Sequence, residues 1–263
     1  MTVHSLTKKK GRHERIAVLT AYDYFTARFL DRAGVDALLV GDSVGMVLYG
    51  ERGTQGMTMP IMLAHTRAVA RAAERALVIA DMPFMSYQPS RERAIGNAGR
   101  FIGEAGAEAV KLEGGLEMAA TVRAITESGI PVMGHIGMTP QSIHRFGGAR
   151  VQGRSDRSHN YLVESAAALE EAGAFAVVLE LVRSETAALI SRSLTIPTIG
   201  IGAGRECDGQ VLVINDILGL YDRFKPKFVR RYAELAPEIE EAARRFVDDV
   251  RSGDFPSEEE SFS

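Results

Sequence analysis

Short apolar runs alternate with longer segments whose apolar residues recur at helical spacing, from about residue 15 to residue 217. Short runs rich in Val, Ile and Leu are typical of buried parallel strands, and the intervening segments have the one apolar face of amphipathic helices. We count eight such runs, at residues 16–21, 37–41, 76–80, 109–112, 131–136, 175–181, 196–201 and 211–214. This repeated strand and helix pattern predicts a parallel sheet covered by helices.

The number of runs favours a closed barrel. A doubly wound open sheet has the same local pattern, but eight strands in a chain of 263 residues match a (β/α)8 barrel of about 250 residues. We therefore predict an α/β fold, a single (β/α)8 TIM barrel with an extra C-terminal helix, over residues 1–253. Residues 254–263 contain three consecutive glutamates and are expected to form a flexible acidic tail.

One connection, residues 139–158, is long for a loop in a compact domain. It contains Gly147, Gly148 and Gly153 together with Arg145, Arg150, Arg154 and Arg157. Long connections of this kind often serve as lids. We expect this segment to order over a ligand at the barrel mouth.

Composition and charge exclude several classes of protein. The chain has 31 basic and 34 acidic residues, a net charge of -3, so no basic excess favours nucleic acid as a partner. No stretch approaches the ~18 apolar residues that cross a membrane. The single cysteine, Cys207, cannot form an intramolecular disulfide, and residues 1–13 lack the apolar core of an export signal, so we expect a cytoplasmic protein. The run Lys8, Lys9, Lys10 is expected to lie on the solvated surface.

Charged residues occur at or near the carboxyl ends of four predicted strands: Asp42, Asp81, Lys111, Glu113 and Glu180. Strand residues two apart share a face, so Asp42 follows Leu38 and Val40, and Asp81 follows Leu77 and Ile79. Any one acid after a strand could simply cap a helix. Five charges on one rim instead imply ion pairing, a metal or catalysis, because burying an uncompensated charge costs several kcal/mol, and barrel enzymes place catalytic residues at this end.

Carboxylates without a His or Cys cluster favour a hard cation, and we expect Mg²⁺. Asp42 and Asp81 are the expected direct ligands, and Glu113 could complete the shell directly or through water. A cation there would polarise a carbonyl and acidify the neighbouring C–H. Glu180 then suits the base, and Lys111 would meet a carboxylate or carbonyl oxygen of the substrate.

Three weaker signals remain open. His135 is either a packing histidine or a hydrogen-bond donor in the pocket. The glycine-rich phrase at residues 199–204 lacks the pattern of a phosphate or dinucleotide loop, so Gly200 and Gly202 are expected to allow a close backbone approach to a ligand. Cys207 has no base near it in the sequence and is expected to be an ordinary thiol.

Longer phrases carry a resemblance to a known family. They are Gly-Asp-Ser-Val-Gly-Met at 41–46, His-Thr-Arg-Ala-Val at 65–69, Ala-Asp-Met-Pro-Phe-Met-Ser-Tyr at 80–87, Val-Lys-Leu-Glu-Gly-Gly at 110–115, Gly-His-Ile-Gly-Met-Thr-Pro-Gln at 134–141, Val-Gln-Gly-Arg at 151–154 and Pro-Thr-Ile-Gly-Ile-Gly-Ala-Gly at 197–204. At these positions the sequence resembles the ketopantoate hydroxymethyltransferases, over about residues 5–235.

The resemblance implies a (β/α)8 barrel, assembled as a homodecamer of two pentameric rings. It implies transfer of a one-carbon unit from 5,10-methylenetetrahydrofolate to 3-methyl-2-oxobutanoate, the first committed step of pantothenate synthesis. It further implies Mg²⁺ on Asp42 and Asp81, with Glu113 in the metal environment and Glu180 as the proton acceptor. Substrate contacts are implied for Asp42, Ser43, Asp81 and Lys111.

Two departures from the family pattern affect the pocket rim. Residues 49–57 do not follow the usual family wording, and Arg183 stands where a proline is common. The first departure affects the rim of the pocket, and the second affects the loop beyond Glu180.

Two alternative functions predict different residues. A related Mg²⁺ barrel lyase acting on an oxo or hydroxy acid typically carries a Lys-Lys-Cys-Gly-His phrase, whereas Cys207 lies in Arg-Glu-Cys-Asp. An effector-binding barrel without catalysis would be expected to lose one of the five charged groups, and all five are present.

Overall fold

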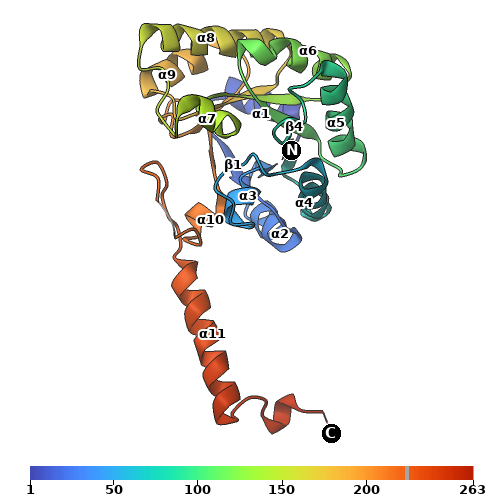
Figure 1. The fold of residues 1–263 in the computed structure, drawn as a ribbon, viewed down its shortest axis with the longest axis vertical. Helices are drawn as coiled ribbons and strands as arrows, with labels where there is room; N and C mark the ends of the chain where they lie inside the picture. Colours follow the sequence, from blue (N-terminus) through green and yellow to red (C-terminus); the bar gives the residue numbers. More distant parts are fainter. Residues whose placement is uncertain (223–224, 263) are drawn as a thin grey trace. The chain divides into compact units, whose positions relative to one another are not determined.

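Eight parallel strands pair in sequence order and close into a barrel, with β1 next to β8 (Figure 1). The computed structural model describes residues 1–222 and 225–262. The strands are β1 Ile16–Thr20, β2 Ala37–Val40, β3 Leu77–Asp81, β4 Ala109–Glu113, β5 Val132–Gly137, β6 Ala176–Glu180, β7 Thr198–Ile201 and β8 Gly209–Leu212. The predicted (β/α)8 barrel is confirmed, and each predicted strand agrees with the observed one to within two residues at either end.

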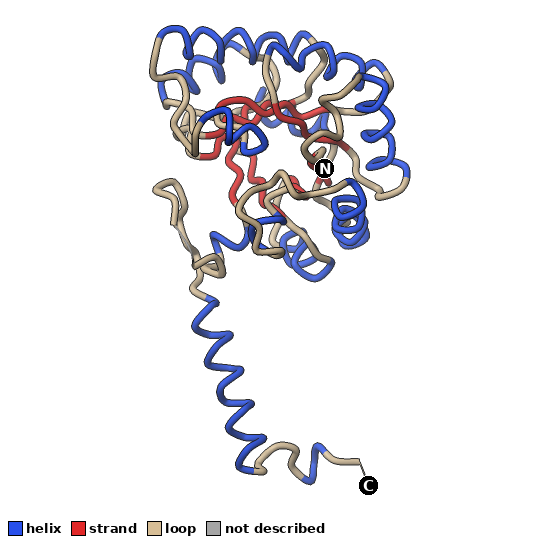
Figure 2. Tube along the Cα trace, in the orientation of Figure 1, coloured by secondary structure: helices blue, strands red, loops and turns tan. Residues whose placement is uncertain are grey.

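Helices surround the strands of this unit, which spans Met1–Val213 (Figure 2). They are α1 Val3–Gly11, α2 Tyr24–Arg32, α3 Val44–Val47, α4 Met59–Ala72, α5 Arg91–Gly103, α6 Ala119–Glu127, α7 Ile143–Phe146, α8 Asp156–Glu171 and α9 Ser184–Ser193. Two 3-10 turns, Leu116–Met118 and Pro140–Ser142, precede α6 and α7. Within the described residues, no helix has the length and apolar character needed to cross a bilayer.

Alternate residues of the strands fill the barrel interior. The interior cluster consists of Ile16, Val18, Ala37, Leu39, Leu77, Ile79, Ala109, Met133, Ala176, Val178, Ile199 and Val211, together with Leu6. Since strand side chains alternate between faces, these residues define which positions further along each strand also point inward.

Helix α1 closes the barrel at the amino ends of the strands. A capping box at Thr2 begins this helix, and its Leu6 is fully buried in the interior cluster. Lys9 pairs with Asp36 at 2.7 Å and Lys10 with Asp208 at 2.9 Å, just before β2 and β8. The prediction that this lysine run is solvated surface is therefore wrong for Lys9 and Lys10, because their partners lie on distant parts of the sequence.

The C-terminal residues, Ile214–Ser263, form a second unit in the described part of the chain. It contains α10 Ile214–Ile217, α11 Leu235–Ser252 and a 3-10 turn, Glu258–Glu260. The helix predicted after the last strand is thus present as α11. In the predicted tail, Ser257 caps the 3-10 turn with its side chain.

We expect Leu6→Ala to lower the free energy of unfolding by about 2–5 kcal/mol, because a fully buried leucine is replaced by a cavity. Urea unfolding at fixed protein concentration measures the change. The matched control is Leu189→Ala on α9, where the leucine is 39% exposed and a smaller effect is expected. Equal effects of the two substitutions would contradict the role of α1 as the closure of the barrel.

Candidate active site

Five functional side chains point into the barrel mouth because of strand alternation. Ile79, Ala109, Met133 and Val178 belong to the interior cluster. Their same-face neighbours at the carboxyl ends of β3 to β6 are Asp81, Lys111, Glu113, His135 and Glu180. All but Glu180 are at least 95% buried, and the Glu180 side chain is 16% exposed.

Asp42 reaches the same place by a different route. The interior residues of β2 are Ala37 and Leu39, so Leu38 and Val40 face the helices and strand parity would direct Asp42 away from the mouth. The strand ends at Val40, however, and the chain turns, with the N–H of Val44 donating to the carbonyl of Gly41. The parity argument was therefore wrong for Asp42, although the structure does bring it to the site.

A buried ion pair links β3 and β4. Lys111 Nζ lies 2.6 Å from Asp81 Oδ1, and the backbone N–H of Asp42 donates to Asp81 Oδ2 at 3.0 Å. Burial alone would lower the pKa of Lys111, but the negative charges of Asp81 and Glu113 outweigh it and raise that pKa. Lys111 is thus held as a cation in the barrel mouth.

Negative charge exceeds positive charge in this cluster. Burial raises the pKa of Asp42 well above its usual range, and the nearby charges of Asp81 and Glu113 raise it further. Burial also raises the pKa of Asp81, although Lys111 opposes the shift. Two buried carboxylates with raised pKa values are a site that gains from an added cation.

The donor set fits Mg²⁺ with waters and substrate oxygens completing its shell. Gln141 Nε2 donates to Asp42 Oδ2 at 2.8 Å. Among the residues that the structure describes, no three His, Cys, Asp or Glu side chains form a metal cluster. Glu113 Oε2 accepts a hydrogen bond from the backbone N–H of Gln141 at 3.0 Å. Two carboxylates plus water and substrate are a usual Mg²⁺ arrangement.

His135 joins the site instead of packing in an apolar core. Its Nδ1 lies 3.5 Å from Glu113 Oε1 and 3.3 Å from Lys111 Nζ, and its Nε2 lies 3.3 Å from Glu180 Oε2. Burial and Lys111 would lower the pKa of His135, but hydrogen bonds to Glu113 and Glu180 raise it to about 9. Of the two interpretations of His135, the structure favours the hydrogen-bonding one.

Gln141 is a site residue that the sequence reasoning did not single out. Its side-chain amide donates to Asp42 and to the carbonyl of Met82, and its amide oxygen accepts the hydroxyl of Tyr87 at 2.8 Å. Gln141 is 4% exposed. Gln141 ends the phrase at residues 134–141 that the sequence shares with the family, and this was the one sign of its importance. The phrase does not show which side chains Gln141 contacts. The residue connects the 139–158 segment to both Asp42 and Glu113.

Ser43 lies beside Asp81 at the start of α3. Its Oγ is 2.8 Å from the hydroxyl of Tyr22, and a side chain added at Gly41 would lie 2.7 Å from that Oγ and 3.5 Å from Asp81 Oδ2. Gly41 is thus needed for the close approach of Ser43 to the site. Tyr22 is a second neighbour that the sequence reasoning missed.

Gly200 in β7 and Gly202 just after it serve the packing and turning of the chain itself. Gly200 faces away from the interior residue Ile199, and a Cβ there would lie 2.9 Å from Cys207 Sγ and 3.1 Å from the Gln210 side chain. Gly200 is therefore required by packing within the protein, in place of the ligand approach that we predicted. Gly202 has φ +62 and forms the turn after β7. Cys207 is fully buried on this outward side, and burial raises its pKa, as expected for an ordinary thiol.

The two departures from the family pattern border the site. In the 49–57 segment, Gln55 Nε2 donates to the carbonyl of Pro140 at 2.8 Å. Beyond Glu180, the N–H of Gln152 donates to the carbonyl of Leu181, and the N–H of Arg183 donates to the carbonyl of Gln152. Both departures therefore contact backbone groups of the 139–158 segment. That segment is partly helical, with the 3-10 turn and α7, and is not one long irregular loop.

Known proteins resemble this chain at two levels, some in fold alone and others along the whole sequence. The chain is similar in fold to a phosphonopyruvate hydrolase solved with oxalate and Mg²⁺, at a TM-score of 0.60 and 15% identity, over 99% of this chain and 93% of that one. It is 57% identical to the 3-methyl-2-oxobutanoate hydroxymethyltransferase of Pelobacter propionicus, over 100% of this chain and 97% of that protein. The enzyme of the same name from Trichlorobacter lovleyi is 59% identical, over 98% of this chain and 96% of that protein.

A family description agrees with these relatives. The sequence pattern of ketopantoate hydroxymethyltransferase matches residues 1–258. Identity above half along the whole chain extends well beyond the short phrases at the barrel mouth. The chain belongs to the ketopantoate hydroxymethyltransferase family and is a hydroxymethyltransferase.

Proposed function

We propose that this enzyme transfers a hydroxymethyl unit from 5,10-methylenetetrahydrofolate to 3-methyl-2-oxobutanoate, giving 2-dehydropantoate for pantothenate biosynthesis. The observation that carries the proposal is the buried group of Asp42, Asp81, Lys111 and Glu113, with Glu180 facing it, in a chain 57% identical to a protein named 3-methyl-2-oxobutanoate hydroxymethyltransferase. Asp42 with Asp81 would supply a position for a hard cation, Lys111 a cationic side chain and Glu180 a carboxylate base, which an enolisation followed by C–C bond formation requires.

Asp42 and Asp81 are the residues that would hold Mg²⁺, with Glu113 in the surrounding shell. The bound cation would withdraw electron density from the keto oxygen of the substrate and make the C3 proton more acidic. Lys111 stays charged beside Asp81 and would bind a substrate oxygen, and Ser43 would contact the same small molecule from the start of α3.

Glu180 is the proposed base. It lies on β6, across the barrel mouth from Asp81 on β3, and its side chain is less buried than those of the other acids. It would take the C3 proton, and the C3 carbanion so formed would attack the methylene carbon of the folate as the bond from that carbon to one folate nitrogen opens. A water molecule would then replace the second folate nitrogen on the same carbon and supply the hydroxyl oxygen, and the nitrogens would take up the released protons as tetrahydrofolate leaves. His135, 3.3 Å away, would hold the carboxylate in place.

We also propose that the protein acts in the cytoplasm as a homo-oligomer, with a decamer as the expected state. Phe25 and Phe29 on α2 are 63% and 62% exposed, and association of copies would bury such apolar surface. The small-molecule substrates would be its other partners.

The metal assignment is tested with Asp42→Asn. This variant keeps an oxygen that can accept from Gln141 and leaves the Lys111–Asp81 pair intact, but it replaces a charged ligand by a neutral one. We expect Mg²⁺-dependent binding of 3-methyl-2-oxobutanoate to weaken about tenfold or more. Isothermal titration calorimetry measures the binding. The control is Asp156→Asn, an exposed carboxylate on α8. If Asp42→Asn binds metal and oxo acid like the wild type, Asp42 is not a ligand.

The base assignment is tested with Glu180→Gln. The amide keeps the size of the side chain but cannot accept the C3 proton, and loss of a general base typically costs about 10² to 10⁴ in rate. We expect near-normal binding of Mg²⁺ and oxo acid with loss of folate-independent exchange of the C3 hydrogen in D₂O, followed by NMR. The control is Glu185→Gln, an exposed side chain on α9. Exchange at the wild-type rate in Glu180→Gln would place the base elsewhere on the rim.

A further inference from the structure

A cavity of about 370 Å³ lies beside the barrel mouth at the ends of β4 and β5. Its size falls in the range of small-molecule sites. Gly114 and Gly137 border it, directly after Glu113 and Ile136. Asp42, Asp81 and Lys111 are not among the residues that line it, so this cavity is distinct from the proposed metal position.

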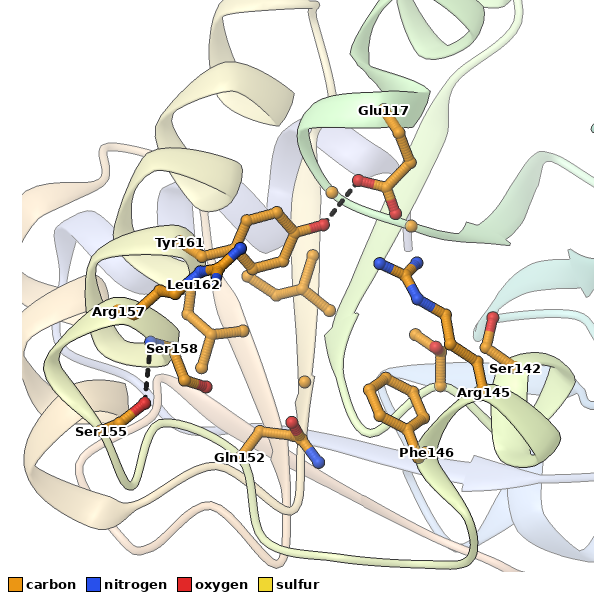
Figure 3. Close-up of a pocket in the computed structure, with 15 residues that line it drawn as sticks. Glu117, Ser142, Arg145, Phe146, Gln152, Ser155, Arg157, Ser158, Tyr161 and Leu162 are labelled. Carbon is orange, nitrogen blue, oxygen red and sulfur yellow. Dashed lines mark hydrogen bonds between the residues drawn. The ribbon is translucent and has the colours of Figure 1, made fainter.

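Its two walls come from α7 and α8, as Figure 3 shows. Arg145 and Phe146 belong to α7, and Arg157 and Tyr161 belong to the amino-terminal part of α8. Phe146 is half-buried and provides an aromatic surface, while both arginines are exposed. The walls therefore combine aromatic surface with positive charge.

The arginines have no acidic partner. Throughout residues 1–222 and 225–262, neither Arg145 nor Arg157 forms an ion pair within 4.0 Å. The one carboxylate that lines the cavity, Glu117, accepts the hydroxyl of Tyr161 at 2.5 Å (Figure 3). Two unpaired guanidinium groups beside an aromatic ring suit a ligand with an aryl group and carboxylates.

The cavity also adjoins the proposed base through the backbone. The N–H of Met138 donates to the carbonyl of Glu180 at 2.8 Å, and a Cβ on Gly137 would lie 2.2 Å from that carbonyl oxygen. Gly137 has φ +100, so the position needs glycine for both its conformation and this close approach. A ligand in the cavity therefore lies next to the segment that carries Glu180.

We infer that this cavity binds the larger of the two substrates, with the aryl group of the folate on Phe146 and its glutamate carboxylates at Arg145 and Arg157. The inference rests on the proposed function, since it assigns a site to the donor named there. The oxo acid occupies the Asp42 and Asp81 side of the mouth, and the donor approaches from the β5 and β6 side. Gln141 joins the two, because its segment leads into α7 while its side chain holds Asp42.

The experiment compares Arg145→Gln/Arg157→Gln with Arg150→Gln/Arg154→Gln. The second pair removes the same charge from the same segment but at arginines that do not line the cavity. Binding of tetrahydrofolate, of tetrahydropteroate, which lacks the glutamate, and of inorganic phosphate is measured by calorimetry. Exchange of the C3 hydrogen of the oxo acid without folate is measured in parallel.

We expect the first double variant to bind tetrahydrofolate about tenfold or more weakly, because two charge-assisted contacts are lost. Tetrahydropteroate should bind the wild type and both variants alike, and C3 exchange should be unchanged. Wild-type tetrahydrofolate binding in the first variant, or the same weakening in the control pair, would overturn the site.

Phosphate competition distinguishes a folate site from a general anion site. If inorganic phosphate, at the same concentration as tetrahydrofolate, displaces tetrahydrofolate from the cavity, then the cavity is a general anion site. That result would also overturn the assignment to folate. Loss of C3 exchange in the wild type would contradict the proposed function. The comparison of tetrahydrofolate with tetrahydropteroate would still decide whether the two arginines bind the glutamate.

Discussion

The need to compensate buried negative charge governs this barrel mouth. Asp42, Asp81, Glu113 and Glu180 meet there, and the cationic partners close to them are Lys111 and His135. A closed barrel leaves little water at the bottom of such a site, so each carboxylate needs a hydrogen-bond donor, a cation or a proton. The raised pKa of Asp42 is the physical sign that the internal partners do not suffice. The same deficit of positive charge favours the binding of a divalent cation.

The barrel architecture separates this reactive end from the end that provides stability. At the amino ends of the strands, α1 buries Leu6 in the interior cluster, and Lys9 and Lys10 fix it to Asp36 and Asp208. At the carboxyl ends, the chain can therefore tolerate a cluster of charged groups that does not favour folding. This division is common to (β/α)8 enzymes. It agrees with a fold shared with a protein that is only 15% identical.

Contacts between segments far apart in the sequence complete the site. The side chain of Gln141 accepts a hydrogen bond from the hydroxyl of Tyr87 and donates one to Asp42. One amide therefore connects the segment after β5 to the turn after β2. Gln55 and Gln152 connect the same segment to the 49–57 segment and to the chain beyond Glu180. The connection over residues 139–158 is therefore held at several points around the mouth.

The sequence by itself determined the eight strands, their order and most of the rim charges. Apolar runs define buried parallel strands, and alternation placed Asp81, Lys111, Glu113 and Glu180 on the inner face, because both signals are local. Tertiary structure decided the rest. Asp42 enters the site through a turn that breaks strand parity, Gly200 makes room for Cys207, and Lys9, Lys10 and Gln141 have partners on other segments. These features depend on which residues, far apart in the sequence, the closed barrel brings into contact. The spacing of residues along the chain does not encode such contacts.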